Sequence, residues 1–148
     1  MNISNDNEFK AALGGLPEVS SRQVAARFAE SVLGLCKDHR LKTAIDTAKR
    51  ADITPDELAT AFQSANAVSV DSYTQCGHDC NWNNQAVHFV AQAVLAGLKP
   101  SEPGSNAAWD AAMHARMART CESIANGDGT DNIEAAAQYR ILAEFLKR

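Results

Sequence analysis

Apolar residues recur every three or four positions along most of this chain, which is the spacing of one buried face of an α-helix. Signals of β-strands do not recur. A first helix is predicted from about Asn5 to Leu13, because Gly14-Gly15 and then Pro17 form a stop signal directly after it. The pattern therefore predicts an all-α protein.

The next two helices are predicted mainly from their apolar stripes. The second helix is expected to begin at Ser20 or Ser21, because Ser20 and Gln23 have the spacing of a capping box. Its stripe consists of Val24, Phe28, Val32, Leu35 and Cys36. A turn near residues 37–39 leads to the third helix. The stripe of that helix consists of Leu41, Ala44, Ile45 and Ala48.

The clearest start signal in the chain is Thr54-Pro55-Asp56-Glu57. Thr54 supplies a capping hydroxyl, Pro55 suits the first helical position, and Glu57 can accept a hydrogen bond in return. Two acidic residues in the first turn also favour the helix dipole. This fourth helix is predicted to end near Val70, and its buried stripe consists of Leu58, Ala61, Phe62 and Ala65.

The helical pattern breaks between Asp71 and Asn84, where the chain is polar, aromatic and poor in aliphatic residues. This segment is predicted to be a long ordered loop or a frayed helical turn. Loops of this length in compact domains are commonly functional or mobile.

Three further helices are predicted in the second half of the chain. The fifth is closed by Gly97 and Pro100, and its stripe consists of Ala86, Phe89, Val90, Ala93, Val94 and Leu98. The sixth ends at Asn126-Gly127, and its expected core stripe consists of Trp109, Met113, Met117, Cys121 and Ile124. The last is expected to be capped by Asp131 with Glu134, and its core stripe consists of Ile133, Ala137, Ile141 and Phe145. We expect one domain over residues 1–148, a bundle of six or seven helices.

Composition agrees with this picture and narrows the class of protein. Alanine dominates the 45% of residues that are hydrophobic, and only 6% are aromatic, which favours closely packed helices. No apolar run is long enough for a transmembrane helix, and the start of the chain has no secretory signal, so a bacterial cytoplasmic protein without membrane contact is expected. The net charge of −4 argues against nucleic acid as the partner.

Charge is distributed unevenly along the chain. Lysine and arginine are concentrated between Arg22 and Arg50, and neither occurs from Ala51 through Leu98. The latter stretch carries Asp52, Asp56, Glu57, Asp71 and Asp79. This is either an ordinary solvated surface or an acidic face that attracts a basic partner protein. Pairing of the acidic stretch with the basic one of a second copy would instead give a homodimer.

Candidate chemistry is sparse. One cluster is rich in metal-ligating side chains and consists of Cys76, His78, Cys80 and His88. Three residues separate Cys76 from Cys80, and the sequence has no second closely spaced pair of cysteines. Free thiols in a reducing compartment are therefore expected rather than a zinc site. Asp110 and His114 lie one helical turn apart and are interpreted as a surface pair. No catalytic motif is present, so we expect a non-enzyme without a cofactor.

A family resemblance covers about a third of the chain. It rests on Arg27-Phe28-Ala29-Glu30-Ser31-Val32-Leu33-Gly34-Leu35, Asp38, Arg40, Ala44-Ile45-Asp46-Thr47-Ala48 and Thr54-Pro55-Asp56-Glu57-Leu58. These stretches resemble the small alanine-rich helical immunity proteins encoded beside bacterial polymorphic toxins. The segment around Cys76 and the chain from Trp109 onward depart from that family. The resemblance implies an all-helical inhibitor of a toxin.

The leading hypothesis is therefore an immunity-type interaction protein that binds and blocks a toxin or other effector. Residues expected to contact the partner are Asp56, Glu57, Asp71, Tyr73, His78, Asp79 and Trp82. Tyr73 and Trp82 are expected to act as aromatic anchors flanked by carboxylates. One alternative is a metal- or ligand-binding module at the segment from Cys76 to His88. Another is an anti-defence inhibitor of phage origin, which would bind in the same way.

Overall fold

The computed structural model of the chain describes residues 3–78, 81–99, 106–129 and 133–147. Over these ranges it contains seven α-helices, one 3-10 helix and no β-strand, so the predicted all-α bundle of six or seven helices is confirmed. The helices are α1 (Asp6–Gly14), α2 (Glu18–Ser31), η1 (Leu33–Leu35), α3 (His39–Ala48), α4 (Pro55–His78), α5 (Trp82–Leu98), α6 (Ala107–Ala125) and α7 (Glu134–Leu146).

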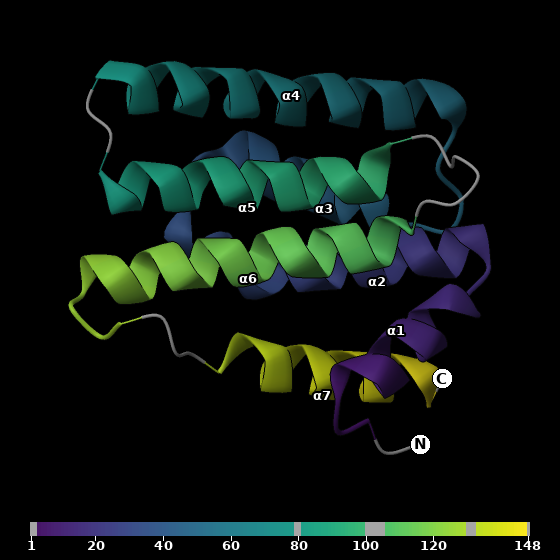
Figure 1. Cartoon of the computed structure of the whole chain (residues 1–148). Helices are drawn as coiled ribbons and strands as arrows, with labels where there is room; N and C mark the ends of the chain where they lie inside the picture. Colours follow the sequence, from purple (N-terminus) through teal and green to yellow (C-terminus); the bar gives the residue numbers. More distant parts are fainter. Residues whose placement is uncertain (1–2, 79–80, 100–105, 130–132, 148) are drawn as a thin grey trace.

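The helices form two layers, and two further helices lie along one edge of them (Figure 1). Helices α4, α5 and α6 lie side by side in one layer, α2 and α3 lie behind it, and α1 and α7 lie beyond α6. Helix α5 is central, and most of its second half is buried. Small residues make this possible: a Cβ atom added at Gly97 would lie 3.0 Å from the Ala25 Cβ of α2. None of the described helices combines the length and apolarity that a membrane crossing would require.

Side chains cap the starts of several helices, and one of these caps was predicted. The Thr54–Glu57 capping box is confirmed, because each residue's side chain accepts a hydrogen bond from the other's backbone N–H. Asn5 and Asn81 cap α1 and α5 in the same way, each through its side-chain oxygen. The predicted start of the second helix is wrong, because α2 begins at Glu18 after Pro17 without a side-chain cap. Proline holds φ near the helical value and needs no donor there.

The loop predicted between Asp71 and Asn84 is largely wrong. Helix α4 continues to His78, and α5 begins at Trp82. The apolar stripe disappears here because serines take the buried positions. Ser69 and Ser72 face α5, and their hydroxyls are satisfied by hydrogen bonds with Gln92, the Ser69 carbonyl and His88.

Two predicted core stripes also need correction. On α6 most of the core is made by alanines beside the predicted stripe; Cys121 is buried as predicted, Trp109 and Met113 are half-buried, and Met117 is exposed. On α7, Ile133 is 75% exposed, whereas Glu134 and Gln138 are buried. Glu134 is therefore not a cap residue but part of a buried polar contact with α6. Asp131, its expected capping partner, lies outside the described residues.

Candidate functional site

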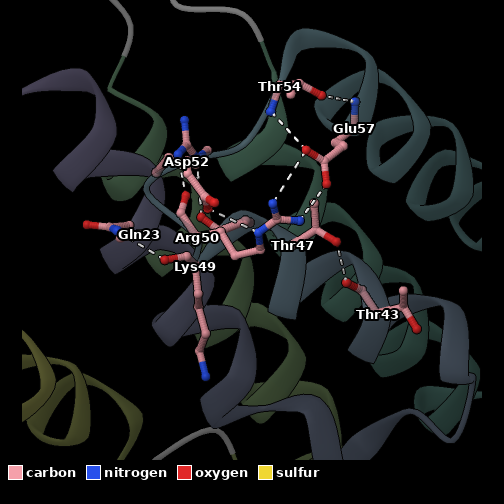
Figure 2. Close-up of polar contacts among 10 residues, drawn as sticks. Gln23, Thr43, Thr47, Lys49, Arg50, Asp52, Thr54 and Glu57 are labelled. Atoms are coloured by element: carbon pink, nitrogen blue, oxygen red, sulfur yellow. Dashed lines mark hydrogen bonds and ion pairs between the residues drawn. The ribbon is translucent and has the colours of Figure 1, made fainter.

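Two of the predicted contact residues, Asp56 and Glu57, lie in the first turn of α4. Figure 2 shows Glu57 beside Arg50, which follows the end of α3. Arg50 donates hydrogen bonds to Glu57 and to Asp52. The hydrogen bond from Arg50, with those from Thr54, holds the pKa of the Glu57 carboxyl below its usual range. Glu57 is thus engaged within the molecule, whereas Asp56 is exposed and forms no ion pair with another described residue.

A shallow groove of about 350 Å³ runs between α3 and α4 next to these carboxylates. Its walls carry hydroxyl groups, and its floor is made by Ala44 and Ala61. The residues that line it are Thr43, Ala44, Thr47, Asp56, Glu57, Thr60, Ala61 and Ser64. Thr47 and Thr43 donate to the carbonyls one turn earlier in α3, so these two hydroxyl protons are already used (Figure 2).

The predicted acidic face is partly neutralised from within. Arg40 on α3 contacts both Asp38 and, at 3.0 Å, Asp71 on α4. The hydrogen bond from Arg40 also holds the pKa of the Asp38 carboxyl below its ordinary value. Arg50 likewise forms an ion pair with Glu57 and lowers the pKa of its carboxyl. Basic residues of the first stretch therefore neutralise acidic residues of the second where α3 meets α4.

Four aromatic rings form a row across the layer of α4, α5 and α6. Tyr73 of α4 lies 5.9 Å from His88 of α5, measured between ring centroids. His88 lies 6.1 Å from Phe89, and Phe89 stacks on His114 of α6 at 6.3 Å. The row therefore links the three helices on one side of the layer.

Exposed apolar side chains extend this row. Tyr73 is 71% exposed, and Val70 lies one turn before it on the same side of α4. Trp82 is 44% exposed and lies seven residues, or two turns, before Phe89 on α5. Met117 follows His114 by three residues on α6. We call this surface the aromatic face, and it consists of Val70, Tyr73, Trp82, His88, Phe89, His114 and Met117.

The imidazoles of the aromatic face are fixed by their surroundings. Nδ1 of His88 lies 3.2 Å from both the Ser72 hydroxyl and the Ser69 carbonyl. The Ser72 hydroxyl also donates to the Ser69 carbonyl at 2.9 Å, so the three groups form one local hydrogen-bonded cluster. Burial lowers the pKa of His114, which favours the uncharged form of the ring that stacks on Phe89.

The predicted surface pair of Asp110 and His114 is only partly correct. Asp110 raises the pKa of His114 by its charge, but burial of the ring is the larger effect. His114 is half-buried against α5 and belongs to the aromatic row, so it is not a simple surface partner of Asp110.

The predicted metal cluster cannot be assembled from the described residues. Asp79 and Cys80, and the side chains of Cys76 and His78, lie outside them. No group of three or more histidine, cysteine or acidic side chains converges in the described part of the chain. Cys36 and Cys121 are buried free thiols, and burial raises the pKa of both.

A buried polar network that the sequence did not predict joins α7 to the bundle. Arg119 donates to Glu134 at 3.0 Å, to Glu122 at 2.8 Å and to the Ser31 carbonyl at 3.0 Å. The Ser31 hydroxyl donates to the second oxygen of Glu134 at 2.8 Å. Glu134 is only 2% exposed.

One turn earlier on α6, Arg116 makes a second polar connection. It donates to Gln138 of α7 at 2.8 Å and forms a two-pronged contact with Asp6 of α1. Tyr139 also donates to Asp6, at 2.7 Å. The three-residue spacing of Arg116 and Arg119 was the only available signal that both point to one side of α6.

Comparisons of the chain with protein-family models, curated proteins and solved structures found no match.

Proposed function

We propose that this protein is a non-enzymatic interaction protein that binds a protein partner through the aromatic face. In keeping with the family resemblance of α2, α3 and the start of α4, the proposed role is that of an immunity-type inhibitor. It would block a toxin or another effector by covering part of its surface.

The exposure of Tyr73 and Trp82 beside other apolar side chains is the observation that carries this proposal. Tyrosine, tryptophan, phenylalanine and methionine are enriched in the centres of protein interfaces, where charged residues are depleted. The aromatic face has this composition. Its members lie on three helices that pack against one another, so the surface is held in shape before any partner binds.

The acidic residues at the start of α4 have a smaller part in this proposal than the sequence indicated. Glu57 is engaged by Arg50 and Thr54, so replacing it would disturb the helix start as well as the surface charge. Asp56 remains available to steer a basic partner during encounter.

Capture of the partner by protein variants tests the proposal. The double variant Tyr73→Ala/Trp82→Ala should lose a protein that the unaltered chain captures from the lysate of its host. The control is Ile133→Ala, which removes an exposed aliphatic side chain directly before α7, a helix that contributes nothing to the aromatic face. This control should capture the same protein as the unaltered chain.

The captures are made at low and high salt and read by mass spectrometry, with helicity checked for each variant. Equal capture by the double variant and by Ile133→Ala would show that the partner binds elsewhere. Loss of capture from both would point to a general effect on the fold and would count against this face as a specific site.

A further inference from the structure

Asparagine or aspartate directly precedes glycine at two places in this chain, and both lie in the turn after α6. The two dipeptides are Asn126-Gly127 and Asp128-Gly129, and all four residues are exposed. At such a dipeptide the backbone nitrogen of the glycine can attack the side-chain carbonyl carbon of the preceding residue, because glycine has no Cβ that would hinder the approach. The turn therefore contains two candidate sites for one ring-closing reaction.

The reaction at an aspartate needs no reactant other than water. The glycine nitrogen forms a bond to the aspartate Cγ and gives up its proton, and the carboxyl group gives up its hydroxyl. One water molecule leaves, and a succinimide ring remains. Water then opens the ring, and opening at the main-chain carbonyl leaves the chain linked through the side chain, as isoaspartate of unchanged mass. At an asparagine the first step releases ammonia instead of water.

The end of α6 holds Asn126 away from this reaction. The Gly127 N–H donates to the Ile124 carbonyl at 3.0 Å, and the next N–H, that of Asp128, donates to the Ser123 carbonyl at 2.8 Å. With Gly127 at a φ of 80°, these two hydrogen bonds form a Schellman motif. Ring closure requires the Gly127 nitrogen to eclipse the Asn126 Cβ, whereas a ψ of −3° places it beside the nitrogen of Asn126 itself. The helix end must therefore open before Asn126 reacts.

Asp128 lies just beyond these hydrogen bonds, and its own reaction uses a different nitrogen. The attacking atom would be the nitrogen of Gly129, whose N–H donates no hydrogen bond to a described residue. A Cβ atom added at Gly129 would meet nothing within 4 Å, so no described group packs against this position. The Asp128 carboxylate also forms no ion pair with another residue in the described part of the chain. None of the described hydrogen bonds has to break for the Gly129 nitrogen to reach the Asp128 side chain.

We propose that Asp128 is a site of spontaneous isoaspartate formation in the folded protein, whereas Asn126 is protected by the hydrogen bonds that end α6. This order is the reverse of the one expected for an unfolded chain, because ammonia leaves an asparagine side chain more readily than water leaves an aspartate. The isomer inserts one extra backbone atom between α6 and α7. It also leaves a free α-carboxylate, the group that protein-repair methyltransferases esterify with S-adenosylmethionine. The inference goes beyond the proposed function and does not depend on it.

Ageing the full chain at neutral pH, folded and unfolded in guanidinium chloride, tests this inference. Isoaspartate is measured by methyl transfer from labelled S-adenosylmethionine with a repair methyltransferase, and fragmentation mass spectrometry assigns the modified residue. In the folded chain, isoaspartate at position 128 should accumulate faster than deamidation at position 126. Unfolding should raise deamidation of Asn126 by about tenfold or more, because the two hydrogen bonds of the helix end are lost, and position 126 should then react faster than position 128.

Three variants assign the product to its source. Asp128→Glu should remove the methyl-accepting product from the folded chain, because the longer side chain closes a six-membered ring far more slowly. Asp46→Glu is the matched control, since it makes the same change at an exposed aspartate of α3 that is followed by threonine. This control should leave the product unchanged, as should Asn126→Gln.

Faster modification at position 126 than at position 128 in the folded chain would overturn the inference. The same relative rates in the folded and unfolded chains would also overturn it, because the hydrogen bonds that end α6 would then protect nothing. Persistence of the product in the folded Asp128→Glu chain would show that another residue is its source.

Discussion

At the scale of single residues, polarity was a poor guide to burial in the C-terminal helix. Glu134 and Gln138 are buried, whereas the more apolar Ile133 is 75% exposed. Sequence patterns treat a glutamate as a surface or capping residue, because buried carboxylates are rare unless they are paired. The pairing residue, Arg119, is far away in the sequence on another helix, so the buried position of Glu134 could not be predicted locally.

Loss of this pairing should cost much more than loss of a surface ion pair. Replacing Arg119 with alanine would remove the guanidinium that pairs with the buried Glu134 carboxylate, so we expect about 3 kcal/mol or more of lost unfolding free energy. Arg40→Ala removes an exposed ion pair and should cost about 1 kcal/mol or less. Urea denaturation of both variants measures the difference. Similar losses would show that the Arg119–Glu134 contact does not stabilise α7.

At the scale of helices, the sequence predicted the starts and stops better than the length of α4. Threonine, asparagine and glycine signals act through neighbouring backbone groups, so Thr54, Asn5 and the turn at Gly127 could be found locally. The second half of α4 could not, because its buried positions are serines whose hydrogen bonds reach across to α5. Tertiary contacts there replace the apolar stripe.

The close packing of α5 on α2 gives a test at this scale. Gly97→Ala would bring a new Cβ to 3.0 Å from the Ala25 Cβ, whereas a Cβ at Gly14, the last residue of α1, meets nothing within 4 Å. Both changes gain helix propensity, so their difference isolates the packing cost. Gly97→Ala should be less stable than Gly14→Ala by about 1–3 kcal/mol in thermal or urea unfolding. Equal stability would mean that the two helices can separate without cost.

At the scale of the whole molecule, the all-helical class followed from the spacing of apolar residues, but the surface did not. The sequence showed a basic stretch followed by an acidic one, and the fold brings them together through Arg40 and Arg50. The fold also presents a partly exposed aromatic surface made by three helices. Tyr73 and Trp82 were predicted as contact residues, whereas Met117 was predicted in the core and His114 in a surface pair; Phe89, also predicted in the core, does pack against it while its ring stacks on His114. Their common location depends on how α4, α5 and α6 pack side by side (Figure 1).

The central claim is that a partner protein covers this face, and site-specific photo-crosslinking in the host cell tests it most directly. A benzophenone side chain is placed at position 73 in one variant and at position 133 in another, since both positions are highly exposed, the first on α4 and the second directly before α7. We predict that position 73 crosslinks to one defined protein and that position 133 does not. Crosslinking to that protein from position 133 alone, or no specific product from position 73, would contradict the account.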